Sequence, residues 1–514
     1  MTGHLLFIFP HLAIPFHSFE KEFPVHIVYI ASFIQEKLGN AVDIKFLDLV
    51  MERIMHQPMN YNDPDVIKRV LKEKIDKDIP AKQSEPLIIA ISCYTSYQYL
   101  STVKILKAIR DLAEEKAIQK PFVVLGGYHP TVVPHDFDNL GVDYVVKGEG
   151  EISLLEIVSA CIARGTVEGH DQMHVIAGKI LKNLDEIPLT RYEIYQPYLE
   201  LYPRLSLALS RGCPRACVFC LEQYLAGMKE PEDRWRSFSI PRAKQEIENV
   251  VKTSDLWLRN VEEKLVGIYD PIFGYNLSWR EQVVRFMAEK RFPYKFWCET
   301  RIDTIKQDHL PIFKDANLQI MLGLETASPR MLTLMNKTRQ PQQYLDRLRK
   351  IMAQSSQIGY GPIVLNLVCN FPGEDLASID ETFDFLTSLT RAGIVFTTTG
   401  HFYHMHPGDN LYLEPDRWER EYGTKVYFKH WWGDEATLSN GCIIDASRSL
   451  DFKTASIAYR EKICNFYKDS MDKTTDVRYK FAFLKKIKAE GERIERNLHV
   501  YESLVGNKIT ATAT

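Results

Sequence analysis

The chain has 514 residues, of which 45% are hydrophobic and 25% charged, and its formal net charge is −3. These values are typical of a globular chain of two to four domains, and they leave no basic surface that would favour nucleic acid as a partner. No apolar run approaches the ~20 residues that a membrane-spanning helix needs. The apolar start lacks a basic region and is interrupted by Pro10 and Pro15, so we expect a cytoplasmic protein without a signal peptide.

The first part of the chain alternates between strand and helix patterns. Apolar residues recur at helical spacing from Pro24 to Gly39 and over residues 98–116, whereas residues 51–84 are charged and predict a helical insertion. This alternation predicts a doubly wound, Rossmann-like parallel sheet, whose ligand lies beyond the carboxyl ends of the strands. Short apolar runs predict its strands at residues 5–9, 43–47, 87–92, 122–125 and 143–147.

A second series of strands follows residues 152–200, which we interpret as a connector with a helix and a hairpin-like stretch. A strand at 205–209 opens this series, and the spacing is that of βα units. It predicts a full or partial β/α barrel of the TIM type, with its site on the loops after the strands. The later strands are predicted at 265–269, 295–299, 319–322, 363–368 and 393–397, and the helices at 278–290, 329–336, 340–356 and 378–392.

Three of the nine cysteines stand in one short stretch directly after the first of these strands. Cys213, Cys217 and Cys220 form a C-x3-C-x2-C pattern, and thiolates bind soft metals and iron–sulfur clusters. A cubane normally takes four thiolates, so three would leave one iron open to another ligand. A structural zinc site would need a fourth ligand nearby, but the next ones along the chain are Cys298 and His309. We therefore expect an iron–sulfur cluster, and the odd cysteine count argues against disulfides.

This motif resembles the signature of the radical S-adenosylmethionine (SAM) enzymes. In that family three thiolates hold a 4Fe–4S cluster, SAM chelates the open iron, and one electron from the cluster cleaves SAM to a 5′-deoxyadenosyl radical. The resemblance implies that Phe219 lies beside adenine, because the family has an aromatic residue at this position. It also implies an electron donor such as flavodoxin or ferredoxin.

Polar residues at the ends of the later strands resemble further SAM-binding positions of the family. Glu299 and Arg301 match the third-strand signature, and an arginine can hold a carboxylate through two hydrogen bonds. Glu325 resembles the fourth-strand residue that binds the ribose hydroxyls, and Asp270 occupies, by position alone, the place that grips the methionine amino group. Phe371-Pro-Gly-Glu374 resembles the turn after the fifth strand. Each of these charges could also serve the fold alone.

A second resemblance concerns the first domain. Gly126-Gly-Tyr-His-Pro-Thr131 together with Val142-Asp-Tyr-Val-Val-Lys-Gly-Glu-Gly-Glu151 is similar to the cobalamin-binding domain that precedes many radical SAM cores. Glycines let the backbone approach a bulky ligand closely, although the same pair could simply make a turn. The resemblance implies cobalamin contacts from Pro10, Ser92, Tyr97, Gly126, Gly127, Thr131, Gly148 and Glu149.

The axial-histidine pattern Asp-x-His-x-x-Gly of other cobalamin proteins does not occur in the sequence. We therefore expect no protein histidine as an axial ligand of cobalt, as the resemblance to the radical SAM subgroup also implies. Nitrogen superhyperfine coupling in an electron paramagnetic resonance (EPR) spectrum of the cobalt(II) form would contradict this hypothesis.

The resemblance weakens beyond about residue 400. His401-Phe-Tyr-His-Met-His406 could supply a three-histidine metal site, but strand alternation would put only His404 and His406 on one face. We favour a structural or substrate-facing role, with Tyr403 and His404 as candidate substrate contacts. Residues 412–432 are rich in aromatic side chains, which suit either a substrate lid or the core of a small domain.

These patterns predict five regions, and helices near 452–470 and 476–497 in the fourth of them. The regions are a cobalamin-binding domain (1–151), the connector (152–200), a radical SAM barrel (201–410), a helical and aromatic C-terminal region (411–505) and a disordered tail (506–514).

Together the resemblances imply a cobalamin-dependent radical SAM methyltransferase. In that chemistry the 5′-deoxyadenosyl radical activates an unactivated carbon (or a phosphorus) of a small metabolite or peptide, and methylcobalamin supplies the methyl group. Relatives with the same two domains imply an alternative, oxidative cyclisation or ring rearrangement without methyl transfer. A non-catalytic cobalamin or redox sensor is a further alternative. Cys298 and Cys369 could serve as a thiol relay, although a core position is the simpler role for a cysteine.

Overall fold

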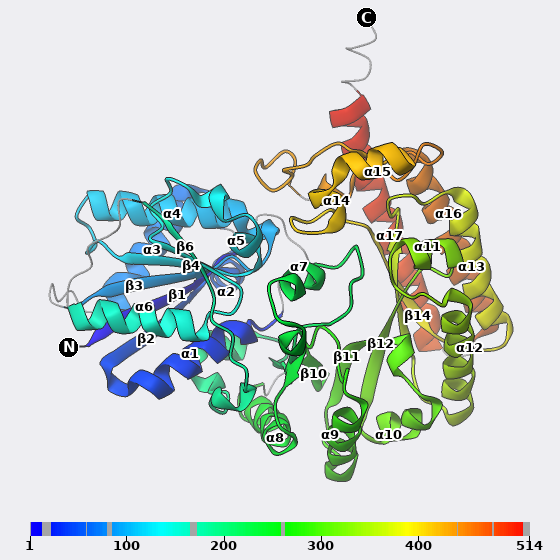
Figure 1. Cartoon of the computed structure of the whole chain (residues 1–514), viewed down its shortest axis with the longest axis horizontal. Helices are drawn as coiled ribbons and strands as arrows, with labels where there is room; N and C mark the ends of the chain where they lie inside the picture. Colours follow the sequence, from blue (N-terminus) through cyan, green and yellow to red (C-terminus); the bar gives the residue numbers. More distant parts are fainter. Residues whose placement is uncertain are drawn as a thin grey trace, which may run out of the picture. The chain divides into compact units, whose positions relative to one another are not determined.

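The computed structural model of the chain describes two compact units (Figure 1). The first comprises Met1–Leu209, Arg236–Gly267 and Trp432–Ser439, and the second comprises Ser210–Trp235, Ile268–Trp431 and Asn440–Thr514. The described residues are 2–12, 22–57, 59–79, 85–164, 172–258, 263–438, 440–474 and 477–506, so the predicted tail lies outside them from residue 507 onward.

The first unit contains a six-stranded parallel sheet in the order β2-β1-β3-β4-β5-β6. Strand β1 lies next to the edge strand β2, and its Leu6 pairs with Lys45 of β2 on one side and with Ile89 of β3 on the other. The predicted Rossmann-like fold is therefore confirmed, and the five predicted strands agree closely with the observed ones. The strands are β1 (Gly3–Phe9), β2 (Val42–Asp48), β3 (Leu87–Ser92), β4 (Phe122–Gly126), β5 (Tyr144–Lys147) and β6 (His174–Ala177).

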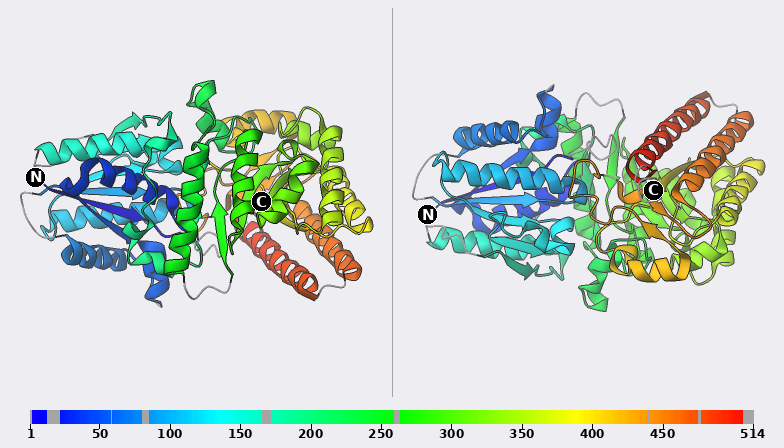
Figure 2. Two further views of the ribbon diagram at one scale, coloured as in Figure 1. Left: turned by 90° about the horizontal axis from the view of Figure 1, so that it is seen from below. Right: turned by 90° about the horizontal axis from the view of Figure 1, so that it is seen from above.

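Helices cover both faces of this sheet (Figure 2). On one face, α1 (Val25–Leu38) contacts α6 (Glu151–Arg164); on the other, α3 (Pro64–Asp78) contacts α4 (Tyr99–Glu114). The short helices are α2 (Leu49–Met55) and α5 (Tyr128–Val132). The predicted insertion thus contributes a helix, α3, that covers the core.

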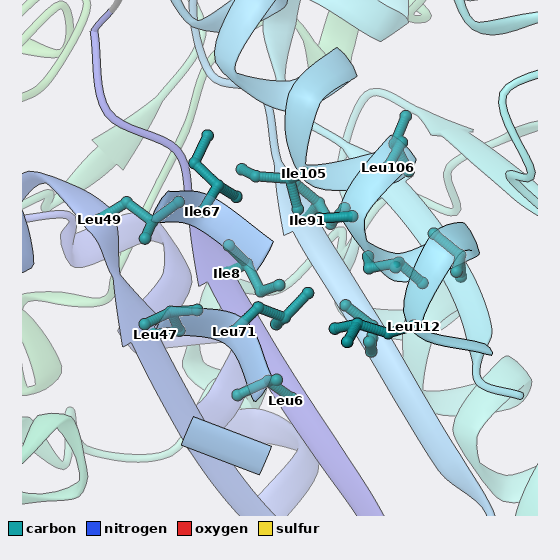
Figure 3. Packing of buried hydrophobic residues seen from close by; sticks show 14 of the residues in the cluster. Leu6, Ile8, Leu47, Leu49, Ile67, Leu71, Ile91, Ile105, Leu106 and Leu112 are labelled. Carbon is teal, nitrogen blue, oxygen red and sulfur yellow. The ribbon is translucent and has the colours of Figure 1, made fainter. Parts of the chain in front are cut away.

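The core under α3 and α4 is made of aliphatic side chains (Figure 3). Alternate residues of β1 point to the same side, so Leu6 and Ile8 face the helices together. Burying one such side chain contributes roughly 1.5–3 kcal/mol, which makes this layer a rigid base for the loops at the strand ends. The helices add Ile67 and Leu71 from α3, and Ile105, Leu106 and Leu112 from α4.

The strand order reverses between β1 and β3. The chain leaves β1 for β2 on one side and then returns to place β3 on the other side of β1. In open parallel sheets such a reversal leaves a crevice at the carboxyl ends of the two strands, where ligands bind. Pro10 and Ser92 lie at these two ends, as the sequence predicts for a ligand site.

The predicted hairpin-like stretch after α6 is wrong. Residues 174–177 form β6, which pairs in parallel with β5, with Val145 opposite Val175. A parallel partner needs a crossover, and α6 provides it. Part of the predicted connector therefore completes the first sheet.

A second parallel sheet has the order β14-β13-β12-β11-β10-β7, which places β14 and β7 at its edges in the described chain. The predicted α/β class of the radical SAM region is confirmed. Its strands are β7 (Ser206–Leu207), β10 (Leu265–Ile268), β11 (Lys295–Arg301), β12 (Leu318–Glu325), β13 (Val364–Cys369) and β14 (Thr397–Phe402). Four further strands have two residues each: β8 (Ser210–Arg211), β9 (Arg236–Ser237), β15 (Lys425–Val426) and β16 (Ile444–Asp445).

The last strand of this sheet starts later than predicted. Residues 393–396 close the preceding helix, α13 (Leu376–Arg391), instead of opening a strand. Gly393 adopts a positive φ of 78°, and the amide of Ile394 donates to the carbonyl of Leu389 at 3.2 Å. The apolar run at this point serves the helix end, a use that strand periodicity does not distinguish.

One face of the second sheet is buried and the other stays partly open. In β13, Leu365, Leu367 and Cys369 are buried, whereas Asn366 is only half-buried. The helices that alternate with the strands are α9 (Leu277–Lys290), α10 (Leu310–Asp315), α11 (Pro329–Leu334), α12 (Pro341–Ile358) and α13. Two more, α7 (Glu222–Gly227) and α8 (Ile240–Trp257), precede β10.

The chain ends in helices as predicted. After α14 (Asn410–Leu413) and α15 (Pro415–Tyr422), two long helices, α16 (Phe452–Lys473) and α17 (Val477–Tyr501), pack side by side (Figure 2). A π-helical turn follows at Glu502–Gly506. Of the described helices, none combines the length and the apolar composition needed to cross a membrane.

Candidate functional site

The loop of residues 213–220 is fixed by backbone hydrogen bonds to two other segments of the second unit. The amide of Val218 donates to the carbonyl of Met335 at 3.1 Å, and the amide of Asn410 donates to the carbonyl of Val218 at 3.2 Å. The loop is thus held between the end of α11 and the start of α14.

The three thiols of this loop lie close enough for their charges to interact. The pKa of the Cys220 thiol is raised to about 12, mainly by burial; the charges of Glu222, Cys217 and Cys213 contribute in the same direction, and a hydrogen bond from the backbone of Glu222 opposes them. In the described ranges no three His, Cys, Asp or Glu side chains are arranged around a single metal ion, and this includes the histidines near residue 404. Three soft donors on one loop fit an iron–sulfur cluster.

Arg301, the last residue of β11, contacts this loop directly. Its Nη1 donates to Cys217 Sγ at 3.2 Å, while Nε and Nη2 each bind a carboxylate oxygen of Asp303 at 2.9 Å. Burial opposes ionisation of Asp303, but the hydrogen bonds and charge of Arg301 outweigh it, so the pKa of Asp303 lies below its usual range. The role predicted for Arg301 in binding a SAM carboxylate stays a prediction.

A second buried ion pair lies beside Phe219. Lys337 Nζ is 2.6 Å from Glu325 Oε1 and 5.8 Å from the centre of the Phe219 ring. Their side chains are only 5% and 9% exposed, and although burial opposes it, the charge of Glu325 raises the pKa of Lys337. Two of the predicted SAM-binding residues, Phe219 and Glu325, are thus brought together by Lys337.

Glu299 lies on β11, and Asp270 follows the end of the neighbouring strand β10. Glu299 is exposed, yet desolvation by the surrounding protein raises the pKa of its carboxyl, and the charge of Glu325 raises it as well. Asp270 is buried and its Oδ2 accepts a hydrogen bond from Ser210 Oγ at 2.6 Å. The predicted contacts of these residues with SAM stay predictions.

In the first unit, the two glycines at the end of β4 have different surroundings. A Cβ on Gly127 would lie 2.5 Å from the carbonyl oxygen of Cys93, and its φ of +108° is a conformation that other residues rarely adopt. A Cβ on Gly126 would meet none of the described atoms within 4 Å. Gly127 is therefore required by the turn itself, whereas Gly126 leaves open space at the carboxyl end of the sheet.

Neutral hydrogen bonds connect the other predicted residues of this region. Thr131 Oγ1 donates to the carbonyl of Gly127 at 2.7 Å and accepts from the amide of Gly148 at 3.0 Å, which ties the loop after β4 to the loop after β5. Ser92 Oγ lies 3.1 Å from His26 Nε2. The carbonyl of Pro10 accepts from the side-chain amide of Gln98 at 2.6 Å.

Two further residues predicted to contact cobalamin are Glu149 and Tyr97. Glu149 is held by Arg236, whose Nη1 donates to Glu149 Oε2 at 3.2 Å, so its carboxylate serves an ion pair. Tyr97 is half-buried in the loop after β3. For both, as for Ser92, Thr131 and Gly148, the contact with cobalamin stays a prediction.

Two family models match the chain. One, described as the B12 binding domain, matches residues 21–158, and the other, described as the Radical SAM superfamily, matches residues 207–386. The chain is a cobalamin-dependent radical SAM enzyme. The two domain matches confirm the family and the three cofactors predicted from the sequence, a 4Fe–4S cluster, SAM and cobalamin.

Curated relatives of this radical SAM enzyme include two that are named for methyl transfer. An uncharacterized methyltransferase of Pyrococcus horikoshii, PH0819, is 25% identical over 408 residues, covering 76% of this chain and 77% of the relative. The hopanoid C-3 methylase of Methylococcus capsulatus is 24% identical over 46% of this chain and 45% of its own. An anaerobic magnesium-protoporphyrin IX monomethyl ester cyclase of Cereibacter sphaeroides is 22% identical over 61% of this chain and 49% of its own. The chain thus spans about half the length of these last two relatives.

Solved structures support the fold. The cobalamin-dependent radical SAM enzyme OxsB, with aqua-cobalamin bound, has a TM-score of 0.65 at 14% identity, over 96% of this chain and 72% of that one. The radical SAM methyltransferase TsrM from Kitasatospora setae, with cobalamin and a 4Fe–4S cluster bound, has a TM-score of 0.60 at 16% identity, over 80% and 77%. At this identity the likeness concerns the fold.

Several residues near the cysteine loop and near the carboxyl end of the first sheet were not predicted from the sequence. Lys337 was not recognised because its ion-pair partner Glu325 is 12 residues away in the sequence. Asp303 was not recognised because it pairs with Arg301 from the turn that follows β11. Neither arrangement gives a periodic sequence signal. At the switch point, Tyr94 stacks on His26 with ring centres 4.5 Å apart, and this pair was also missed. The position of Tyr94 directly after a predicted strand could have indicated it.

The candidate substrate residues lie beyond β14, so the strand alternation expected for them does not apply. Tyr403 is buried and its hydroxyl donates to Asp409 Oδ2 at 2.7 Å. The ring of His404 stacks on His406 at 4.8 Å and meets the edge of Trp431 at 4.4 Å. Their contact with substrate stays a prediction.

Two further predicted features are buried in the fold of the second unit. The carboxylate of Glu374, in the Phe-Pro-Gly-Glu turn, accepts from the amide of Asn370 and from the hydroxyl of Tyr459, both at 2.8 Å. Burial raises the pKa of Cys298 and Cys369, which keeps their thiols protonated. This state matches the core role expected for the two cysteines.

Proposed function

We propose that this enzyme is a methyltransferase acting on an unactivated carbon, or a phosphorus, of a small metabolite or peptide. The observation that supports this most is the similarity to the Pyrococcus horikoshii methyltransferase, because it extends over 408 residues and three quarters of both chains. A match of this length extends beyond either of the two domain matches alone.

The chain's own residues have separable tasks in this proposal. Cys213, Cys217 and Cys220 hold the cluster and leave one iron for SAM, and Phe219 with Glu325 offers an adenosine-binding surface beside Lys337. The open space at Gly126 admits the corrin ring. When bound, the cluster and SAM supply a carbon-centred radical, and cobalamin supplies the methyl group.

The test is anaerobic reconstitution with iron, sulfide, cobalamin and SAM, plus a one-electron donor of the flavodoxin or ferredoxin type. We expect both 5′-deoxyadenosine and S-adenosylhomocysteine, and neither product from a Cys217→Ala control. Formation of 5′-deoxyadenosine without S-adenosylhomocysteine would contradict methyl transfer and favour radical chemistry of another kind. Neither product from a protein with an intact cluster, tested with candidate substrates, would favour a sensor.

Oxidative cyclisation is the second candidate. The similarity to the magnesium-protoporphyrin IX monomethyl ester cyclase extends over 346 residues and supports it. A product that loses hydrogen atoms without gaining a methyl group, seen by mass spectrometry, would decide for this candidate.

A further inference from the structure

We propose that Arg301 is a positioning residue that sets the reduction potential of the 4Fe–4S cluster through its hydrogen bond to the Cys217 sulfur. The inference rests on the presence of the cluster and not on methyl transfer, so it can fail or hold independently of the proposed function.

The guanidinium of Arg301 is fixed from three sides. Nη1 lies 3.2 Å from Cys217 Sγ, the opposite edge is paired with Asp303, and Nη2 also donates to the carbonyl of Lys337 at 2.5 Å. Both Arg301 and Cys217 are less than 10% exposed. A planar, buried cation with all of its edges occupied has little freedom to turn away from the sulfur.

A hydrogen bond to a cluster sulfur favours the reduced state. The cluster accepts one electron from the low-potential donor and forms or breaks no bond in that step, so its total charge becomes more negative by one. A donor and a positive charge at the sulfur stabilise the more negative state, and hydrogen bonds to sulfur are among the factors that set the potentials of such clusters. Removing the guanidinium therefore shifts the potential to a more negative value.

Asp303 makes the inference sharper, because its charge acts in the opposite direction. The carboxylate holds the guanidinium in place but also partly neutralises it. Replacing it by the uncharged Asp303→Asn removes a negative charge near the cluster while Arg301 remains. The potential then shifts to a more positive value.

The same guanidinium could instead bind the SAM carboxylate. A carboxylate forms two parallel hydrogen bonds with either edge of a guanidinium. The edge of Nε and Nη2 already binds Asp303 at 2.9 Å, and on the other edge Nη2 also donates to the carbonyl of Lys337. The thiolate contact uses the remaining nitrogen. The geometry thus favours the cluster as the group on which Arg301 acts.

The test is a potentiometric titration of the reconstituted full-length protein, followed by EPR of the reduced cluster in the absence of SAM and substrate. We expect a more negative potential for Arg301→Gln, a more positive one for Asp303→Asn, and an unchanged one for Arg330→Gln. Arg330 is a matched control, because it loses the same charge in the second unit but binds the carbonyl of Gly373 and the carboxylate of Asp375.

Iron and sulfide content is measured for each variant. If Arg301→Gln does not retain the cluster, the inference is decided by the sign of the change in reduction potential in Asp303→Asn. Unchanged potentials in both variants with full iron content, or shifts of the same sign, would overturn the inference. A loss of SAM affinity at unchanged potential would overturn it in favour of the carboxylate role.

Discussion

The loops at the two candidate cofactor sites, one after β4 in the first unit and one at Cys213–Cys220 in the second, are stabilised by different kinds of groups. After β4, the turn consists of backbone and neutral groups: Gly126 leaves room, Gly127 adopts the positive φ that the turn needs, and Thr131 ties the loop to Gly148. The cysteine loop of the second unit is instead contacted by buried charges. The difference matches the cofactors, since a corrin ring needs space, whereas a cluster that gains an electron responds to every nearby charge. Substitutions in the first region should act through shape and those in the second through charge.

The largest expected effect on stability comes from breaking the buried pair of Lys337 and Glu325. Removing one partner leaves an uncompensated buried charge, so Lys337→Met should lower the free energy of unfolding of the cofactor-free protein by about 3–5 kcal/mol. Urea titration measures this. The control Lys314→Met removes an exposed lysine whose ammonium donates to the carbonyl of Ile358, and it should cost less than about 0.5 kcal/mol. A loss below about 1 kcal/mol in Lys337→Met would show that the pair is not isolated from water.

The two adjacent glycines give the sharpest test of shape in the first unit. Gly127→Ala should destabilise the fold by about 2–3 kcal/mol, because its φ of +108° is strained for alanine and its Cβ meets backbone at 2.5 Å. Gly126→Leu should leave the unfolding curve nearly unchanged but abolish cobalamin binding, since its side chain fills the open space. Thermal unfolding and the absorbance of bound cobalamin separate the two effects. Full cobalamin binding by Gly126→Leu would mean that the corrin lies elsewhere.

Sequence reasoning predicted the shape-based region better than the charge-based one. Strand ends and glycine pairs are local signals, so the Rossmann-like sheet and the turn at Gly126 could be read from short windows. Arg301 and Cys217 are 84 residues apart, and no periodicity indicates that a strand-end arginine will contact a thiol. The start of β14 was predicted too early for a different, local reason: Gly393 ends a helix within an apolar run, and periodicity alone does not distinguish such a run from a strand.

The segment Trp432–Ser439 was missed for another reason. The sequence placed it in the C-terminal region, but its contacts make it part of the first unit. Trp432 is buried there, and Lys104 Nζ is 2.6 Å from Glu435 Oε1. Long-range returns of this kind depend on the complete fold and leave no mark in local composition.

The pH dependence of stability should reveal a buried acid of the second unit. Burial raises the pKa of Glu374 to about 8, although hydrogen bonds from Tyr459 and Asn370 oppose this. Because the folded protein then binds more protons than the unfolded chain, the contribution of Glu374 is complete below its unfolded pKa near 4.5 and is lost as pH rises toward about 8. Asp409, with a pKa raised to about 7 by burial, acts in the same direction.

We expect the wild-type free energy of unfolding to fall relative to Glu374→Gln by about 1–2 kcal/mol between about pH 6 and pH 7.5. Urea titrations of both proteins across this range measure the difference. Parallel curves would mean that Glu374 ionises in the folded protein as it does in water.

We expect the smallest effect from substitutions of two neighbouring tryptophans, of which Trp432 belongs to the first unit and Trp431 to the second. Trp432 Nε1 donates to Asp136 Oδ2 at 2.7 Å and its ring meets the edge of His129, which lies directly after the Gly126–Gly127 turn. Trp431 Nε1 donates to the carbonyl of Met405, also at 2.7 Å. Trp432→Phe and Trp431→Phe should each cost about 1 kcal/mol, because each loses one hydrogen bond of a buried indole.

Only Trp432→Phe should also weaken cobalamin binding, by a few-fold, because the loosened His129 no longer supports the turn. Equilibrium binding of aqua-cobalamin to the two variants measures this. Equal affinities would show that the segment at Trp432 contributes to the stability of the first unit without shaping its cofactor site.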